Sequence, residues 1–338
     1  RRRLRRRERR GRRRGLDRRW GRCRRALLAR NRGAAIQIDA ATATIEDVIV
    51  RATQPTEATG DLAGFGYGIG IQDDRDTGAP ADVVLRRALV TDNHEFGVFV
   101  TGSAATIEDV VVRGTRPGAM DGRFGRGVNV QDSLGTGTSG SVTIRRCAVE
   151  DNADIGLAVI GSTATIEDSV VRDTRASAAT GRFGYGIGVQ VSEEIGTPGA
   201  AVIARTLIRG NRQVGLYVGG ATATVEACAI RDTLPEESTG EFGDGVMAAE
   251  LLGGDDFTAV EVRCSRIEDS ARAGVFFYGA GGSLCGSVVR GGVFAVALEE
   301  GADPMLCDDN LYEDNERNDV SVGQGLEPAP PLEPLDEY

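Results

Sequence analysis

The sequence has no lysine, a single histidine (His94), a single tryptophan, and aromatic residues at only 5% of its 338 positions. All 40 basic residues are arginines, a bias that reflects high-GC codon usage rather than chemistry. One histidine excludes metal sites built on histidine and most catalytic triads. The absence of a C-x-x-C motif argues against a zinc site. No apolar run near the N-terminus is long enough for a signal peptide or a membrane span.

What the sequence contains instead is a repeat of about 59 residues. An Ala-Thr-Ile/Val-Glu motif recurs in steps of 62 (105 − 43), 59 (164 − 105) and 59 (223 − 164) residues, starting at Ala43, Ala105, Ala164 and Ala223. A fixed period of this size is typical of a stacked array. Each unit holds two similar segments of short period-2 runs, rich in Val and Ile and bounded by Gly, Asn, Asp and Thr. Such runs predict strands rather than helices, so each unit is expected to form two coils of a solenoid.

Strands this short bury their apolar sides only when coil stacks on coil, in parallel sheets with strands about 4.8 Å apart. The alignment predicts about eleven coils and a rod roughly 50 Å long. The coils are predicted to begin near residues 21, 43, 82, 105, 141, 164, 200, 223, 259, 282 and 304. The predicted inward-facing residues are Ile45, Val50, Leu85, Val90, Ile107, Val112, Ile144, Val149, Ile166, Val171, Ile203, Ile208, Val225 and Ile230.

One polar position recurs at the same corner of nearly every predicted coil. Its members are Asn31, Thr53, Asn93, Thr115, Asn152, Thr174, Asn211, Thr233, Ser270 and Asn315. Asn tolerates the left-handed conformation and its amide can bond the neighbouring coil, while Thr or Ser does this less well. We therefore expect a structural row at this corner in preference to a ligand-binding row.

A charged pair follows the first strand, and its sign alternates from coil to coil. Down the stack it reads Arg24-Arg25, Glu46-Asp47, Arg86-Arg87, Glu108-Asp109, Arg145-Arg146 and Glu167-Asp168, and then weakens to Ala204-Arg205 and Glu226-Ala227. Opposite charges one strand apart attract, and like charges repel. This alternation explains why the period is two coils rather than one. The rival interpretation, paired catalytic carboxylates or calcium ligands, is disfavoured because arginines flank each acidic pair.

Corner-and-strand blocks of the form N-x-x-x-G-[VIL]-x-[VIL] begin at Asn93, Asn152 and Asn211. With these blocks the chain resembles the right-handed parallel β-helix repeat proteins of the pectate-lyase-like fold, over residues 21–325. The resemblance implies an all-β, single-stranded right-handed parallel β-helix. It implies no single activity, because this fold hosts lyases, hydrolases, epimerases, adhesins and phage spikes.

The sequence departs from the active-site motifs of enzymes with this fold. A polygalacturonase-like site needs a Gly-His-Gly motif and a lysine, and an alginate-epimerase-like site needs Asp-Pro-His, whereas here Asp303-Pro304 is followed by Met305. A pectate-lyase-like site, with clustered calcium-binding Asp and an Arg base such as Arg75, stays open. The candidate residues lie in loops of alternate coils, about 10 Å apart: Asp73, Asp74, Arg75, Asp76, Asp132, Glu193, Glu194, Asp255 and Asp256. Oxygen-rich loops of this kind can bind Ca²⁺ weakly, but ordinary solvated acidic loops are the favoured interpretation.

A second set of loops in alternate coils ends in Phe-Gly, at Phe65, Phe124, Phe183 and Phe242, with Tyr67 and Tyr185 nearby. Exposed aromatic residues beside carboxylates would suit sugar binding. A satellite core beneath the loops is the favoured alternative. His94, beside a corner asparagine, is interpreted as a solvated loop residue.

The chain is expected to divide into an Arg-rich segment (1–20), a β-helix domain (21–325) and a Pro-rich acidic tail (326–338). The first is interpreted as disordered or as a non-native fragment with the true N-terminus missing, and the tail as a stiff extended tail or linker. Residues 33–338 hold 22 Arg against 48 acidic residues, so a body with net charge −26 should repel nucleic acid and anionic membranes. Cys264, Cys285 and Cys307, spaced 21 and 22 residues apart, should stack on adjacent coils, close enough for one disulfide if their side chains face each other. The alternative is that they are small buried hydrophobic residues.

These observations predict a non-catalytic, secreted or cell-surface β-helix protein that binds a polysaccharide or a protein partner through loops on one flank. The alternative is a calcium-assisted polysaccharide lyase or another carbohydrate-active enzyme of this fold. The expected location is extracellular or at the cell surface, with no cofactor other than Ca²⁺ under the alternative. A third interpretation, nucleic-acid binding by the basic N-terminal arm, lacks aromatic residues among the arginines and any recognition motif.

Overall fold

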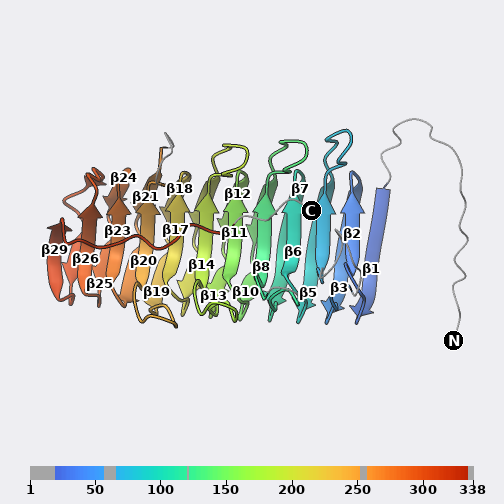
Figure 1. Cartoon of the computed structure of the whole chain (residues 1–338), viewed down its shortest axis with the longest axis horizontal. Helices are drawn as coiled ribbons and strands as arrows, with labels where there is room; N and C mark the ends of the chain where they lie inside the picture. Colours follow the sequence, from blue (N-terminus) through green and yellow to red (C-terminus); the bar gives the residue numbers. More distant parts are fainter. Residues whose placement is uncertain (1–19, 57–65, 120–121, 252–256, 334–338) are drawn as a thin grey trace, which may run out of the picture.

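The computed structural model describes residues 20–56, 66–119, 122–251 and 257–333. In this part of the chain every regular element is a β-strand, and the coils stack into a rod (Figure 1). All strand pairs are parallel, within one sheet of 18 strands and one of 11 strands. The all-β solenoid predicted from the sequence is therefore confirmed. The described residues contain no helix with the length and hydrophobicity to span a membrane.

The rod has eleven coils, and each coil contributes one strand to the 11-stranded sheet. From coil 1 to coil 11 these strands are β2 (Ile36–Asp39), β4 (Ile69–Gln72), β6 (Phe96–Thr101), β8 (Arg126–Gln131), β11 (Ile155–Ile160), β14 (Tyr185–Gln190), β17 (Val214–Gly219), β20 (Asp244–Ala249), β23 (Ala273–Tyr278), β26 (Phe294–Glu299) and β29 (Arg317–Val322). Successive strands pair in one continuous register, which only the last pair interrupts. The predicted number of coils is confirmed.

The 18-stranded sheet bends around a corner of the rod. In coils 1 to 4 one long strand passes through the corner: β1 (Trp20–Ala29), β3 (Thr42–Arg51), β5 (Asp82–Thr91) and β7 (Ala104–Arg113). From coil 5 onwards the corner divides it into two strands: β9 (Ser141–Arg145) and β10 (Ala148–Glu150), β12 (Thr163–Glu167) and β13 (Val170–Arg172), β15 (Ala200–Ala204) and β16 (Leu207–Arg209), β18 (Thr222–Glu226) and β19 (Ala229–Thr233), β21 (Ala259–Arg263) and β22 (Arg266–Ser270), β24 (Gly281–Cys285) and β25 (Val288–Arg290), and β27 (Met305–Leu306) and β28 (Leu311–Glu313).

The core of the rod is a continuous column of aliphatic side chains. Each of the predicted inward-facing residues is at most 2% exposed. They alternate with outward-facing residues along each strand, as in β7, where buried and partly exposed positions alternate. Burying a Val, Leu or Ile side chain contributes about 1.5–3 kcal/mol. The column therefore supplies the main driving force for stacking, and its small residues suit a narrow interior.

The corner between the two halves of the 18-stranded sheet is a single residue in the left-handed conformation. Asp47, Arg87 and Asp109 occupy it in coils 2 to 4, with φ of 56°, 48° and 55°. This conformation costs a non-glycine residue roughly 1–2 kcal/mol. It turns the chain within one residue and directs a charged side chain outward, where ion pairs with neighbouring coils offset the strain.

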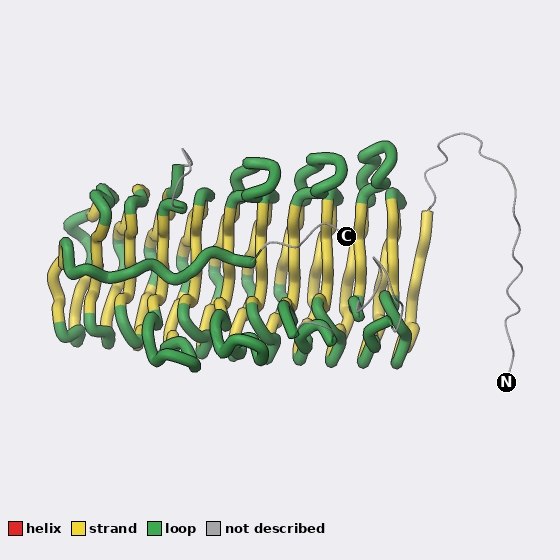
Figure 2. The backbone as a smooth tube through the Cα atoms, viewed as in Figure 1, coloured by secondary structure: helices red, strands yellow, loops and turns green. Residues whose placement is uncertain are grey.

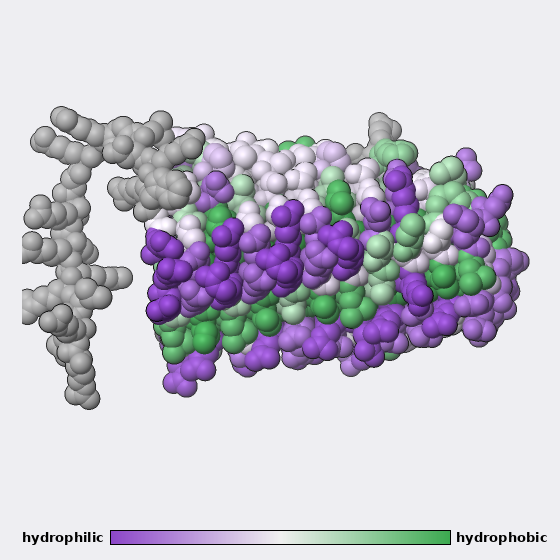
Figure 3. Space-filling model, turned by 180° about the vertical axis from the view of Figure 1, so that it is seen from behind, coloured by the Kyte–Doolittle hydropathy of each residue, from purple (hydrophilic) through white to green (hydrophobic). Residues whose placement is uncertain are grey.

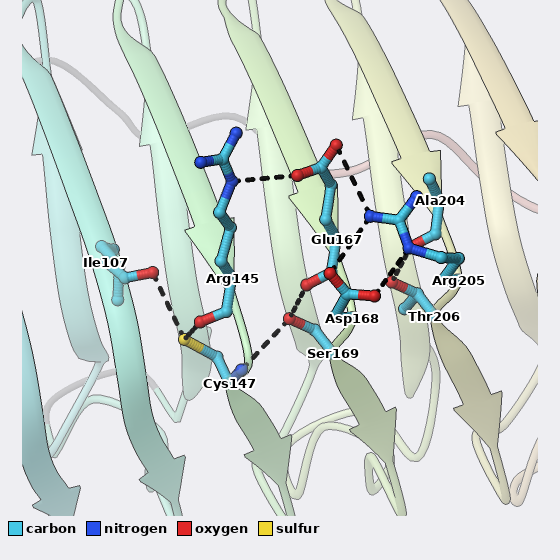
Figure 4. A network of polar contacts seen from close by, with 9 residues as sticks. All are labelled: Ile107, Arg145, Cys147, Glu167, Asp168, Ser169, Ala204, Arg205 and Thr206. Atoms are coloured by element: carbon cyan, nitrogen blue, oxygen red, sulfur yellow. Dashed lines mark hydrogen bonds and ion pairs between the residues drawn. The ribbon is translucent and has the colours of Figure 1, made fainter.

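Ion pairs along this corner form the predicted alternating charge ladder. The first residues of the charged pairs bridge coils 1 and 2, 3 and 4, and 5 and 6: Arg24–Glu46 at 2.8 Å, Arg86–Glu108 at 2.9 Å and Arg145–Glu167 at 2.9 Å. The second residues bridge the intervening junctions: Asp47–Arg87 at 2.7 Å, Asp109–Arg146 at 2.8 Å and Asp168–Arg205 at 2.7 Å. Every junction from coil 1 to coil 7 thus has an ion pair, and Figure 4 shows those of Arg145 with Glu167 and of Asp168 with Arg205. Seen from behind, hydrophilic side chains run in stripes along the rod beside a hydrophobic stripe (Figure 3).

The corner after the second strand carries the predicted asparagine row. Asn152 Oδ1 accepts a hydrogen bond from the backbone N–H of Thr115 (3.0 Å), and its Nδ2 donates to the carbonyl of Val112 (3.2 Å). Asn211 makes the same two bonds to the coil before it. The structural interpretation is confirmed with one correction. The threonine side chain was expected to bond the neighbouring coil, but the buried Thr115 hydroxyl has no hydrogen-bond partner among the described residues. Thr115 contributes only its backbone N–H to this row.

A third row, which the sequence analysis missed, explains why the long strand divides at coil 5. The position after the first corner is apolar in coils 2 to 4 (Val48, Ala88 and Val110). From coil 6 it holds mainly Ser or Thr, and each serine oxygen takes over a backbone N–H that would otherwise bond the next coil's carbonyl. Ser169 Oγ accepts a hydrogen bond from Cys147 N at 3.1 Å (Figure 4). The bonds Cys228–Ser265 and Ser265–Ser287 repeat the arrangement.

The cysteines follow the predicted pattern near the C-terminal end. Cys285 and Cys307 form a disulfide, with Cα atoms 4.9 Å apart on coils 10 and 11. Cys264 is exposed and free, one coil before them. Cys147 and Cys228 are buried and unpaired, as expected for small hydrophobic residues. Residues 1–19 of the Arg-rich segment lie outside the described residues.

Candidate binding surfaces

Loops that lead from the 11-stranded sheet into the next coil project from one edge of the rod. Residues 73–81, 132–140 and 191–199 form three such loops, one in every second coil (Figure 2). Successive loops are two strand spacings apart, or about 10 Å. The predicted candidate residues lie here, and we call this set of three loops the loop row.

The two aspartates that begin these loops are buried, which corrects the prediction that they are solvated. Asp73 is 4% exposed, and its carboxylate accepts a hydrogen bond from Thr136 Oγ1 at 2.6 Å. Asp132 is 1% exposed and lies over Gly161, where a Cβ would come within 2.4 Å of Asp132 Oδ2. A glycine is thus needed for this close approach. The sequence places both aspartates one residue past the strand, where the chain still follows the sheet and the next coil covers the side chain.

Asp132 is a buried carboxylate without a cation beside it. Neither of its oxygens has a hydrogen-bond partner of normal geometry among the described residues. Burial raises the pKa of Asp132 to about 6, and the nearby Ser192 hydroxyl offsets only part of this effect. Asp132 therefore carries an energetic cost at neutral pH.

The remaining loop residues divide between a structural role and the surface. Asp74 Oδ1 accepts hydrogen bonds from the backbone N–H groups of Asp76 (3.1 Å) and Thr77 (2.9 Å), and these hydrogen bonds, chiefly those from Thr77, lower its pKa. Exposed side chains at the loop tips are Arg75, Asp76, Glu193 and Glu194. Asp255 and Asp256 lie outside the described residues.

The acidic side chains of the loop row are spread along the edge rather than gathered. Nowhere in the described part of the chain do three or more His, Cys, Asp or Glu residues come close enough to hold a metal ion. The described residues therefore contain no cluster of ligands for the Ca²⁺ ion that the lyase hypothesis requires. His94 is half-buried rather than solvated, with Nδ1 2.9 Å from the carbonyl oxygen of Thr53.

The aromatic residues of the second loop set lie beneath the loops, which confirms the satellite core. Phe124 and Phe183 are 2% and 4% exposed. Phe124 packs against Phe96 with ring centroids 5.6 Å apart, and Phe183 packs against Tyr185 at the same distance. Tyr67 and Tyr185 are buried as well and Phe242 is half-buried, so this set is largely covered, and Phe65 lies outside the described residues.

The course of the C-terminal tail is the feature that sequence reasoning missed. After β29 the chain turns back and runs along the outer face of the 11-stranded sheet (Figures 1 and 2). Tyr185 Oη donates to the carbonyl of Pro330 at 2.8 Å, and Gln190 Oε1 accepts from Leu332 N–H at 2.7 Å. One signal pointed to this contact. The outward positions of β17, β20 and β23 carry Tyr217, Met247 and Phe276, which would expose a large apolar surface without a cover.

Two buried arginine–carboxylate pairs lie on the same face. Arg126 is fully buried, with Nε 3.0 Å from Asp154 Oδ2 and Nη1 2.9 Å from Asn129 Oδ1. Arg272 pairs with the buried Asp244 in the same way, with Nε 2.9 Å from Oδ1. Burial raises the pKa of both Asp154 and Asp244, while the paired arginine opposes the rise. Each carboxylate is held by its arginine, so both pairs act as fixed anchors.

Stacked parallel coils with asparagine and charge ladders agree with the family comparison. The model of the right-handed β-helix region matches residues 34–230, which is more than half of the chain. The chain belongs to this β-helix family. No curated protein matches the β-helix sequence significantly.

Solved structures resemble this β-helix at low sequence identity. The Dettilon tailspike protein matches with a TM-score of 0.49 and 12% identity, covering 89% of this chain and 55% of the tailspike. The pectate lyase Pel9A matches with a TM-score of 0.45 and 13% identity, covering 81% and 70%. The Streptococcus pneumoniae surface protein and adhesin PfbA has a TM-score of 0.38 and 6% identity, covering 83% and 76%. The β-helix thus spans about half the length of the tailspike.

Proposed function

We propose that this protein is a non-catalytic binding rod, secreted or displayed at the cell surface, which contacts an uncharged polysaccharide through the loop row. The observation that carries the proposal is the regular spacing of the loops. They project in register from every second coil, and their exposed tips present Asp76, Glu193 and Glu194. A periodic row of this kind suits a ligand that is itself a repeating polymer.

The charge of the rod narrows the ligand class. Residues 33–338 carry a net charge of −26, from 22 Arg and 48 acidic residues, and the loop tips add to the acidic surface. A surface with this charge repels polyanions such as uronic-acid polymers. Carboxylates still accept hydrogen bonds from the hydroxyl groups of a neutral sugar chain. An uncharged glycan therefore fits better than an acidic one.

The disulfide supports the proposed location. The Cys285–Cys307 bond is of a kind that persists in oxidising compartments and is rare in the cytosol. The non-catalytic role is supported by the acidic residues themselves. Asp73 is buried within the coil stack and accepts a hydrogen bond from Thr136, and Asp74 holds its own turn, so two of the candidate residues have structural roles.

Affinity electrophoresis in gels containing a neutral glucan or a uronic-acid polymer tests the proposal. We expect the protein to be retarded by neutral glucans and not by polyuronates. A triple variant, Asp76→Ala with Glu193→Ala and Glu194→Ala, should lose most of the retardation. The matched control replaces two exposed acidic residues of another loop, Glu237→Gln with Glu241→Gln, and should behave like the original protein.

Two results would contradict the proposed function. The first is lyase activity, measured as an unsaturated product that absorbs ultraviolet light. If such a product forms from a polyuronate in the presence of Ca²⁺, and a chelator abolishes its formation, the protein is a lyase instead. Retardation that persists unchanged in the triple variant would move the ligand away from the loop row. Failure to bind any neutral glycan, together with capture of a protein partner that depends on the same three residues, would establish protein binding.

A further inference from the structure

The tail, residues 326–333, has a period of three. Ala329 and Leu332 are buried and Leu326 is half-buried, while Glu327 and Pro331 between them are exposed. Three residues per turn is the period of a polyproline II helix, and the segment Pro328-Ala-Pro-Pro331 favours that conformation. The tail therefore presents one apolar edge, made of every third residue, to the sheet beneath it.

The length of the tail matches the face that it covers. Its contacts run from Arg272 in coil 9 to Arg126 in coil 4, five strand spacings or about 24 Å apart. The carbonyl groups that they reach belong to Glu327 and Glu333, which a polyproline II helix places about 19 Å apart, at about 3.1 Å per residue, and the long arginine side chains span the remainder. The tail thus lies along the rod axis, as Figure 1 shows, and its hydrogen bonds reach side chains of coils 9, 6 and 4.

The tail lies on a face with an aromatic floor, and we call this face the tail groove. Ala329 and Leu332 belong to one buried apolar cluster with Tyr185, Tyr217 and Phe276. Leu332 fills the space above Gly188, where a Cβ would come within 2.7 Å of its Cδ1. A side chain at position 188 would close this pocket. Aromatic-lined grooves are the general means by which proteins recognise polyproline II segments.

The polar contacts of the tail groove engage the backbone of the tail. Arg272 Nη1 donates to the carbonyl of Glu327 (2.9 Å), Tyr185 Oη to that of Pro330 (2.8 Å), and Arg126 Nη2 to that of Glu333. Gln190 holds both polar backbone groups of Leu332, accepting its N–H at 2.7 Å and donating to its carbonyl at 3.4 Å. Backbone contacts of this kind select for the polyproline II conformation of the bound segment, while the apolar pockets select for apolar side chains at every third position.

Charge adds a further element of recognition. Arg123 Nε lies 3.0 Å from the carboxylate of Glu333, close to the buried Arg126. The side chain of Glu327 is exposed, and Arg272 contacts only its backbone carbonyl, so the printed charge contact of the tail is that of Glu333. The Arg123 end of the groove therefore favours an acidic residue at the position of Glu333.

The connection between rod and tail permits release. Gly323 and Gly325 both have positive φ, 64° and 72°, and a Cβ on either would meet no atom within 4 Å. Residues 322–325 are all exposed. The side chains of this hinge pack against little, but Glu299 Oε1 accepts hydrogen bonds from the backbone N–H groups of Gln324 (2.6 Å) and Leu326 (3.2 Å). The segment that leaves the rod is therefore the part after Leu326, which is held by its contacts in the groove.

We propose that the tail groove is a binding site for acidic, proline-rich peptides in polyproline II conformation, and that the protein's own tail is its resident ligand. A peptide from another polypeptide, with apolar residues at every third position, binds there when the tail leaves. Release of the tail removes the bonds that Tyr185, Gln190 and Arg126 make to its backbone, while Arg126 keeps Asp154 and Asn129, and an incoming backbone restores the lost bonds. This proposal does not depend on the loop row.

A full-length protein with a protease site inserted between Gly323 and Gln324 provides the test. The probe is a fluorescein-labelled peptide with the sequence of residues 324–333. Its binding is measured by fluorescence anisotropy, before cleavage and after cleavage and removal of the tail. Cleaved protein should bind one peptide. Intact protein should bind it at least about 30-fold more weakly, because a tethered tail competes at millimolar effective concentration.

Peptide variants locate the contact. Leu332→Ala in the peptide removes a buried leucine and should weaken binding by about tenfold or more. Glu327→Gln, at an exposed side chain, is the matched control and should change the affinity by less than about twofold. A full-length Leu332→Asp variant, in which the tail is released without cleavage, should gain peptide binding as well.

Three outcomes would overturn the proposal. The first is a cleaved protein that keeps its β-sheet circular dichroism and cooperative melting but does not bind the peptide. The second is equal binding by intact and cleaved protein. The third is equal binding of the original and Leu332→Ala peptides, which would place the contact outside the groove. If cleavage unfolds the rod, the full-length Leu332→Asp variant decides by the same measurements.

Discussion

The two ends of the rod are stabilised by different means. From coil 1 to coil 7 each junction has an ion pair of the alternating ladder, and among the described residues no disulfide joins these coils. At the corner, Ala227 replaces the charged residue in coil 8 and Cys264 in coil 9, and Ala204 has already replaced the charged strand residue of coil 7. A disulfide ties coils 10 and 11 together. The tail lies across coils 4 to 9 and so covers parts of both regions.

This difference shows that stacking itself does not need the ladder. The aliphatic column and the strand register continue unchanged through coils 8 to 10, where the ladder has ended. The ladder therefore sets which coils lie next to each other, while burial drives their association. The disulfide acts at the end of the stack, where the last coil has a neighbour on only one side.

Among the changes that test this difference between the two ends, removal of the disulfide should lower the stability of the protein most. Cys285→Ser with Cys307→Ser opens a loop with a sequence separation of 22 residues, which should cost about 3 kcal/mol of unfolding free energy. Hydrogen exchange should then show coils 10 and 11 opening before coils 1 to 7. Cys264→Ser, at an exposed free thiol, is the control and should leave the exchange pattern unchanged. Opening that starts at coil 1 in the double variant would refute this account.

Breaking an asparagine corner should destabilise the N-terminal half by about 2–3 kcal/mol. Asn152→Ala leaves the buried N–H of Thr115 and the carbonyl of Val112 without partners. Thr115→Val is the matched control, since the Thr115 hydroxyl has no partner and only its backbone takes part. Urea unfolding followed by circular dichroism measures both. Equal losses in the two variants would show that the asparagine bonds are not the cause.

Replacing Asp132 should stabilise the protein at neutral pH by about 2 kcal/mol. Its folded pKa of about 6 lies above the usual unfolded value of about 3.9, so the folded state holds the proton more tightly. Stability from this residue is therefore present below about pH 4 and lost as the pH rises from about 4 to about 6. Asp132→Asn should remove that dependence, as melting curves between pH 4 and pH 8 would show. Asp73→Asn, at a carboxylate that accepts a bond from Thr136, should bring no such gain.

Cutting one rung of the charge ladder should have the smallest effect. Asp168→Asn removes the charge partner of Arg205 on an exposed corner and should lower Tm by about 1–2 °C, less in high salt. The hydrogen bond from Arg205 lowers the pKa of Asp168, so its contribution is present above about pH 4 and lost as the pH falls through the folded pKa. Glu226→Gln, beyond the end of the ladder, is the control. A larger loss from Glu226→Gln would show that the ladder does not confine its effect to coils 1 to 7.

Most of the fold could be predicted because its determinants are periodic. Each inward residue, such as Ile107, recurs one coil later at the paired position Ile144, so one alignment gives the register of the whole stack. The same alignment gives the charge and asparagine rows. The serine row was missed because Ser169 and Ser265 differ little from ordinary surface residues in sequence. Their function depends on a backbone N–H in the neighbouring coil.

The candidate surface was predicted less well because exposure at a loop is set by neighbouring coils. The local sequence does not distinguish Asp73 and Asp132 from Asp76, but these two residues lie one residue past the strand, where the next coil covers them. The tail was predicted to be extended from its prolines. Where it docks could not be predicted, because the docking face is built from single residues of coils far apart in sequence, such as Arg126 and Arg272.

The alternating corner imposes a parity rule on the growth of this molecule. Loss of one coil from the stretch Arg24 to Asp168 would bring glutamate against glutamate or arginine against arginine across the new junction, whereas loss or gain of two coils restores the original order. Gene duplication in this stretch is therefore accommodated in steps of one 59-residue unit. Rods of this type should differ in length by whole pairs of coils.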